Sequence, residues 1–162
     1  MSDFAALKAS IARPRSSVRL CLRGDLFAER DRVVQELARE AAESASLAGS
    51  PVVTELRDRL TDLELQMDKA THVFTCEAVP RSVFADLEDA YPPNDEGGPS
   101  KGFFVALVAA TLVEPDLTAD QVGELFDDLS DGQVDVLESA AWAVNREGGT
   151  LPLGVSDLEK TR

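Results

Sequence analysis

The fold is decided by one stretch between Asp25 and Thr71, which reads DLFAERDRVVQELAREAAESASLAGSPVVTELRDRLTDLELQMDKAT. In its second half, apolar residues recur at alternating intervals of three and four, the a/d spacing of a coiled coil. These residues are Val53, Leu56, Leu60, Leu63, Met67 and Ala70. The first half repeats the pattern more loosely, at Val34, Leu37, Ala41, Ala45 and Ala48. The sequence therefore predicts two helices folded back on each other.

The connection between these helices is short and has the residues of a tight turn. Gly49 is expected to end the first helix, and Ser50 to cap the second. Pro51 then lies in the first turn, where a proline leaves no hydrogen bond unmade. A helix of about twenty residues is roughly 30 Å long. We expect an antiparallel helical hairpin of that length.

Two segments of alternating apolar residues flank the hairpin, Val18–Arg23 before it and His72–Val79 after it. Because the helices are antiparallel, these strands also run antiparallel and can pair at the base of the hairpin. The side-chain period of a strand places Cys21 and Cys76 on opposite faces, so we expect two free thiols. Two strands alone are marginally stable, which predicts that they pack on helices or pair with further strands.

The remaining chain is expected to be helical. Residues 1–17 read as a short amphipathic helix and a basic linker. Helices are predicted from Pro80 to Ala90, over the apolar run Gly102–Glu114, and after two capping boxes that begin at Thr118 and Ser130. Residues 148–162 carry no periodic pattern and are expected to form a flexible tail. The predicted fold class is α+β with mostly helical content. Residues 18–147 are expected to form a single domain, with the strand–hairpin–strand part at 18–79 and a C-terminal helical bundle at 80–147.

The charge distribution limits the kinds of partner. The chain has a formal net charge of −14, and between Phe84 and Glu138 it holds fourteen acidic residues against Lys101 alone. A surface of that sign repels phosphate backbones, so we expect no nucleic-acid binding. No apolar run reaches the length of a membrane span, and no secretory signal is recognisable, which predicts a cytoplasmic protein without membrane contact.

Catalytic and metal-binding motifs are weak. His72 is the only histidine, and no phosphate loop or zinc-ligand pair is present. The segment Asp127–Glu138 matches much of a calcium loop, but its third position is Leu129, which cannot bind a cation. Two capped helices joined at Ser130 explain the same residues. We therefore expect a non-enzymatic protein without cofactor or metal, with a calcium-binding module as a lesser alternative.

Several segments together carry a resemblance to a known family. They are LCLRGDL (20–26), SLAGSP (46–51), FTCEAVPR (74–81), FFVALV (103–108), VEPDLT (113–118) and AAWAVNR (140–146). This ordered set resembles the tail assembly chaperones of long-tailed, siphovirus-type phages that infect actinobacteria. The resemblance covers most of the chain, from about Val18 to Arg146.

The resemblance implies a function in virion morphogenesis. A chaperone of this family binds the long, helical tape measure protein and keeps it soluble in the host cytoplasm while the tail tube assembles. It implies as further partners a longer, frameshifted form of the chain and the tail tube protein, and we expect a homo-oligomer.

A chaperone for a helical client needs an exposed apolar surface. The candidate partner-binding residues are those of the second hairpin helix, Val53, Leu56, Leu60, Leu63 and Met67. The alternative is that packing on the first helix buries this seam entirely. A different function also stays open: an acidic regulatory or inhibitory binding protein, such as a DNA mimic, that acts on a basic host protein.

Overall fold

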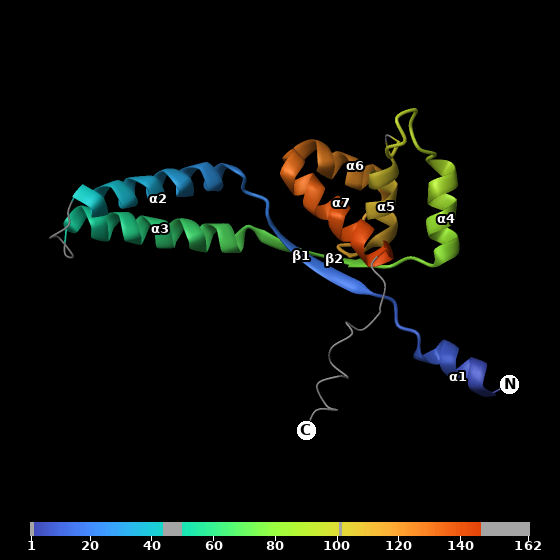
Figure 1. Cartoon of the computed structure of the whole chain (residues 1–162). Helices are drawn as coiled ribbons and strands as arrows, with labels where there is room; N and C mark the ends of the chain where they lie inside the picture. The colour runs from blue at the N-terminus through green and yellow to red at the C-terminus, as the bar shows by residue number, and fades with distance from the viewer. Residues whose placement is uncertain (1, 44–49, 101, 147–162) are drawn as a thin grey trace, which may run out of the picture. The chain divides into compact units, whose positions relative to one another are not determined.

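The computed structural model describes residues 2–43, 50–100 and 102–146 and shows a mostly helical α+β fold (Figure 1). In chain order the elements are α1 (Ser2–Ser10), β1 (Arg15–Cys21), α2 (Asp25–Glu43), α3 (Pro51–Lys69), β2 (Thr71–Glu77), α4 (Arg81–Ala90), α5 (Phe103–Thr111), β3 (Leu112–Glu114), α6 (Ala119–Asp128) and α7 (Asp131–Arg146). The predicted fold class is confirmed: a helical hairpin lies between two antiparallel strands, and packed helices follow. Residues 19–73 form one compact unit, and the described residues on either side form a second unit.

Helices α2 and α3 lie side by side and antiparallel, as predicted (Figure 1). Their shared core contains Leu26 and Val33 from α2 with Leu56 and Leu63 from α3. Leu37, Leu60 and Met67 pack against this core and are partly buried. An apolar stripe on each helix is removed from water by the other, which is the main source of stability for such a hairpin.

The predicted apolar face of α2 was right at Leu37 and wrong at Val34 and Ala41. Val34 and Ala41 are exposed, while the core uses Leu26, Val33 and Leu37; Ala45 and Ala48 lie outside the described residues. The seam continues through Arg30, which stands between Leu26 and Val33 and donates to Glu64 on α3 at 3.3 Å. An arginine packs its aliphatic stem and keeps its charged end in water. Counting only apolar residues therefore missed this position.

The ends of the hairpin helices follow the sequence closely. Ser50 lies at the N-cap of α3 and Pro51 in its first turn, as predicted, but the Ser50 side chain makes no capping hydrogen bond. Gly49 lies outside the described residues. Asp25 is the first residue of α2, and its carboxylate accepts hydrogen bonds from the Arg23 guanidinium at 2.7 and 2.6 Å. The Arg23 side chain thereby lowers the pKa of Asp25.

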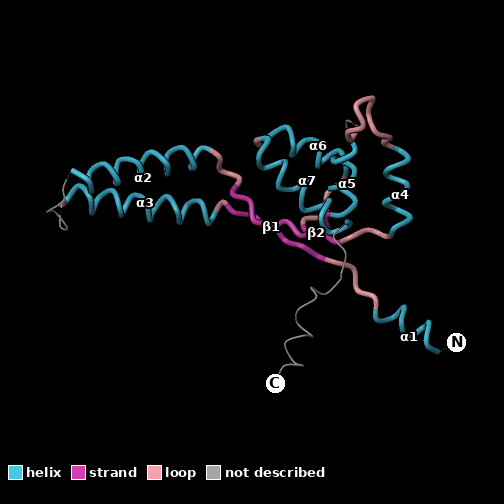
Figure 2. The backbone as a smooth tube through the Cα atoms, viewed as in Figure 1, coloured by secondary structure: helices cyan, strands magenta, loops and turns pink. Residues whose placement is uncertain are grey.

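The sheet has three strands in the order β1-β2-β3, shown as magenta tube in Figure 2. Pairing of β1 with β2 continues beyond both strand ends, because the Ala78 N–H donates to the Pro14 carbonyl at 2.9 Å. Strand β3 pairs antiparallel with β2, with Thr75 opposite Glu114 and Cys76 opposite Leu112. Of the two predicted outcomes, packing on helices or pairing with further strands, the structure shows the pairing with a third strand. Cys21 and Cys76 are both free thiols, as predicted.

The prediction of one helix from Gly102 to Glu114 was wrong at its end. Helix α5 stops at Thr111, and Leu112–Glu114 form β3. The Thr111 hydroxyl donates to the carbonyls of Leu107 and Val108 at 2.9 and 3.2 Å, inside the last turn of α5. A continuous apolar run does not distinguish a buried helix from a buried strand. The partner strand β2, distant in sequence, decides the conformation here.

Helices α4, α6 and α7 contact α5, the most apolar helix of the bundle. Val122 of α6 and Leu137, Ala141 and Val144 of α7 are buried. The capping box at the start of α6 is confirmed, with the Gln121 N–H donating to Thr118 Oγ1 at 3.3 Å and the Thr118 N–H to Gln121 Oε1 at 2.9 Å. At the start of α7 the Ser130 N–H donates to Gln133 Oε1 at 3.1 Å.

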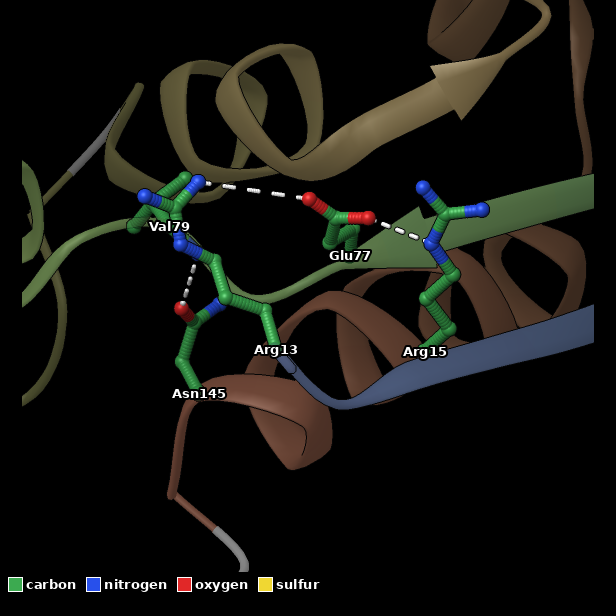
Figure 3. A network of polar contacts seen from close by, with 5 residues as sticks. All are labelled: Arg13, Arg15, Glu77, Val79 and Asn145. Atoms are coloured by element: carbon green, nitrogen blue, oxygen red, sulfur yellow. Dashed lines mark hydrogen bonds and ion pairs between the residues drawn. The ribbon is translucent and has the colours of Figure 1, made fainter. Parts of the chain in front are cut away.

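Polar contacts tie the segment after β2 to its neighbours (Figure 3). The Val79 N–H donates to Asn145 Oδ1 near the end of α7 at 3.0 Å. Glu77 lies between two arginines: Arg15 donates to Oε2, and Arg13 lies 4.0 Å from Oε1. These contacts fix the end of β2 against β1 and α7. The predicted tail, 148–162, lies outside the described residues.

Candidate functional site

The structure places the five predicted partner-binding residues along the inner face of α3. Val53, Leu56 and Leu63 are buried, and Leu60 and Met67 are partly buried against the core of the hairpin. These residues therefore pack on α2. Such burial within the hairpin was the alternative to partner binding that the sequence left open. Their role in binding a partner stays a prediction, and a docking surface on the closed hairpin requires other side chains.

A different apolar surface is left uncovered in the helical bundle. All nine side chains of α5 are apolar except Thr111, and a helix that is apolar on every side is normally buried completely. Only Phe103, Leu107, Val108 and Thr111 are buried. Phe104 is half-buried, and Ala110 is exposed. Helices α4, α6 and α7 therefore cover α5 incompletely.

An aromatic groove lies beside this uncovered part of α5. Its walls are formed by residues of α4, α5 and α7 and of the loop between α4 and α5: Glu88, Tyr91, Pro93, Gly97, Gly98, Pro99, Phe103, Phe104 and Trp142. The groove has a volume of about 370 Å³, which lies near the lower end of the ~300–1,000 Å³ typical of ligand pockets. We refer to these nine residues as the aromatic groove.

Trp142 is at the centre of the aromatic packing that shapes the groove. The centroid of its ring lies 6.0 Å from that of Phe84, 6.3 Å from Phe103 and 6.2 Å from Phe104, in tilted or edge-on orientations. Such arrangements stabilise aromatic pairs beyond the burial of their area. Trp142 nevertheless leaves 36% of its surface exposed. A large aromatic side chain that is fixed on one side and open on the other is a suitable anchor for a partner.

Acidic side chains border the aromatic groove. Glu88 lines it directly. Asp135 and Glu138 line an adjoining cavity of about 300 Å³ that shares Phe104 and Trp142 with it. Burial raises the pKa of Glu138, and the nearby Asp135 carboxylate raises it further. A partner with a positive charge beside its apolar contact would relieve this repulsion.

One basic side chain touches the same surface. The guanidinium carbon of Arg146 lies 4.8 Å from the ring centroid of Trp142, within cation–π distance. This contact shows that the exposed face of the indole accepts a cation. Arginine or lysine side chains from a partner have the same chemistry.

Gly102 fixes the wall of the groove at the start of α5. Its φ is +92°, in the left-handed region, and it occupies the N-cap position of the helix. A Cβ atom at this position would lie 3.3 Å from Tyr91 Cε1. Tyr91 lines the groove, so a side chain at residue 102 would push against this ring. Only glycine combines this conformation with this contact without strain.

Metal-binding side chains do not cluster in the described part of the chain. Among residues 2–43, 50–100 and 102–146, no cluster of three His, Cys, Asp or Glu side chains is suited to hold a metal ion. The segment of the possible calcium loop forms the end of α6 and the start of α7, with Leu129 as the C-cap of α6. In the same residues, no helix is long and apolar enough to cross a membrane.

The aromatic groove was not predicted from the sequence. Phe103 and Phe104 belong to the apolar run that was predicted to be a helix. A usable signal was present, because a helix that is apolar on every side exposes apolar surface wherever its neighbours do not cover it. The position of Trp142 over Phe104 depends on the packing of α7 against α5 and is not readable from spacing.

Comparison with known proteins gives no relative. No protein-family model, no curated protein and no solved structure matches the chain.

Proposed function

We propose that this chain is a non-enzymatic tail assembly chaperone of a long-tailed phage, which binds the tape measure protein and keeps it soluble during tail tube assembly. The ordered resemblance from about Val18 to Arg146 supports this function. The observation that carries it is the aromatic groove, where Trp142 and Phe104 remain accessible on an incompletely covered helix. A protein that binds an aggregation-prone helix needs such a surface in its folded state.

The groove has the chemistry of a helix-binding site. An amphipathic helix docks on a protein by inserting apolar side chains spaced three or four residues apart into an apolar groove. Trp142 and Phe104 would contact such side chains, while Glu88 and Asp135 would face basic residues that flank them. The apolar contact supplies most of the affinity, and the acidic border favours helices of the right charge.

Co-expression with the tape measure protein encoded nearby tests this function. We expect soluble tape measure protein only when the chain is present, and co-purification that persists at high salt because the contact is mainly apolar. Phe104→Ala and Trp142→Ala should reduce the recovered client strongly, whereas Leu65→Ala, at an exposed position of α3, should not. A client that stays insoluble in the presence of the chain contradicts the proposal.

A second candidate is an acidic regulatory or inhibitory protein that binds a basic host protein. The fourteen acidic residues between Phe84 and Glu138 favour it, together with the adjacent carboxylates of Asp135 and Glu138. Binding of this type depends on long-range charge attraction and collapses as ionic strength rises above about 0.15 M. Co-purification of a basic host protein that is lost at high salt, with no effect on the tape measure protein, would favour this alternative.

A further inference from the structure

Helix α1 presents an apolar face that packs on nothing in the described part of the chain. Phe4, Leu7 and Ile11 are 72%, 62% and 69% exposed. Phe4 and Leu7 lie three residues apart on one side of α1, and Ile11 follows directly after the helix ends at Ser10. Within α1, Asp3 and Lys8 carry opposite charges, while Arg13 and Arg15, beyond the helix, are paired with Glu77. The segment therefore combines exposed apolar side chains with the positive charge of Lys8 near its C-terminal end.

A helix of this length is not stable by itself. Helix α1 spans nine residues, and isolated helices shorter than about 12–15 residues are marginal in water. Three exposed large apolar side chains add to the cost of leaving the helix in solvent. Both properties indicate that α1 is completed by a surface that its own copy does not supply.

The aromatic groove complements α1 in shape and charge. It provides an apolar wall at Phe104 and Trp142, which suits the stripe of Phe4, Leu7 and Ile11. Its border carries Glu88, and the adjoining cavity carries Asp135 and Glu138, opposite in sign to Lys8 on α1. Apolar contact at the centre with opposite charges around it is the common arrangement of a protein interface.

We propose that helix α1 of one copy docks into the aromatic groove of a second copy, so that the chain self-associates by exchange of this helix. The exposure of Phe4, Leu7 and Ile11 shows that α1 does not fill the groove of its own copy. The exchange buries the apolar stripe of α1 and the open face of Trp142 at the same time. It requires no rearrangement of the bundle that forms the groove.

Self-association by this route does not depend on the identity of the client, because it is tested on the chain alone. It also adds to the proposed function. A client helix and α1 would compete for the same groove, so the chain protects its apolar surface with a neighbouring copy until a client displaces it. A failure of client binding would leave the exchange intact, and the two results are distinguishable.

Sedimentation velocity of the full chain from about 1 to 200 µM tests the proposal by mass action. Trp142, the only tryptophan, reports occupancy of the groove through its emission maximum. We expect a concentration-dependent increase in mass, accompanied by a blue shift of Trp142 emission. The double variant Phe4→Ala, Leu7→Ala keeps strong helix formers in α1 but removes its apolar stripe, and should weaken association about tenfold or more.

A second variant tests the groove without touching its core. Glu88 and Asp135 are exposed, so Glu88→Lys with Asp135→Lys reverses the charge of the border and should also weaken association. A mixture of the two double variants is the decisive sample. Each supplies the part that the other lacks, so the mixture should associate more tightly than either variant alone. Leu65→Ala serves as the matched control on α3 and should associate like the original chain.

The opposite results are equally clear. A chain that stays monomeric over the whole concentration range would overturn the proposal. If substitution of Leu7 changes Trp142 emission in that monomer, α1 occupies the groove of its own copy. Association that is unchanged in both double variants would overturn it as well, as would a mixture that associates no better than its components.

Discussion

Leu63→Ala in helix α3 should destabilise the hairpin, whereas Leu65→Ala two residues later should not. Leu63 is 3% exposed and belongs to the core formed with Leu26, Val33 and Leu56, while Leu65 is 52% exposed. The two substitutions remove the same atoms from the same helix. They differ only in the side of the helix on which the side chain lies, so the pair isolates burial from helix propensity.

The expected difference follows from the burial of Leu63. Leucine to alanine removes about three methylene equivalents, each worth about 0.8 kcal/mol when buried, which gives roughly 2.4 kcal/mol. A residual cavity adds to this value, and measured Leu→Ala losses in cores span about 2.7–5 kcal/mol. A core between two helices can relax toward a cavity, so we expect a loss of about 2.5–3 kcal/mol. For Leu65→Ala we expect a change within about 0.5 kcal/mol.

Urea unfolding followed by circular dichroism at 222 nm measures both variants, and hydrogen exchange of the α2 and α3 amides assigns the loss to the hairpin. Because the chain has two compact units, local exchange is the safer measure if the transition is not two-state. Equal losses in the two variants, or a larger loss for Leu65→Ala, would refute the assigned register of α3 against α2.

Three further predictions concern the groove and β2. Gly102→Ala should destabilise the chain by about 1–2 kcal/mol, because the φ of Gly102 is +92° and an added Cβ would meet the Tyr91 ring. Gly132 has open space around it and no positive φ, so Gly132→Ala should be near neutral in the same urea titration. Burial raises the pKa of Glu138, so the ionised Glu138 carboxylate destabilises the fold at neutral pH. Glu138→Gln should therefore be more stable than the original chain at pH 7. This difference in stability should shrink as the pH falls through about 4–5 and Glu138 becomes protonated. Cys76 is fully buried and burial raises the pKa of its thiol, so alkylation followed by mass spectrometry should modify Cys76 only after denaturation.

The local features of the fold were predictable because they are encoded in short-range patterns. The hairpin follows from the a/d spacing of Val53, Leu56, Leu60 and Leu63, and the start of α6 from its capping box. On α2 the predicted positions Val34 and Ala41 are exposed, and Val33 faces α3 instead. Arg30, which donates to Glu64 on α3, lies between Leu26 and Val33, and a search for apolar residues alone passes over it.

The features that failed depend on contacts between distant segments. Strand β3 forms because Leu112 pairs with Cys76, and no property of the apolar run Gly102–Glu114 indicates that pairing. The aromatic groove likewise requires α7 to place Trp142 over Phe104. Burial of the predicted seam was an open alternative in the sequence, since a repeating stripe has the same spacing whether it packs within the hairpin or on a partner.

Fluorescence of Trp142 during titration with helical fragments of the tape measure protein tests the central claim most directly. With the Phe4→Ala, Leu7→Ala variant, the groove is free of neighbouring copies, and the sole tryptophan reports on it alone. The account predicts a saturable blue shift with at least one fragment, retained at high salt and abolished by Phe104→Ala. Fragments that bind without any change in Trp142 emission, or only at low salt, would contradict a client site in the aromatic groove.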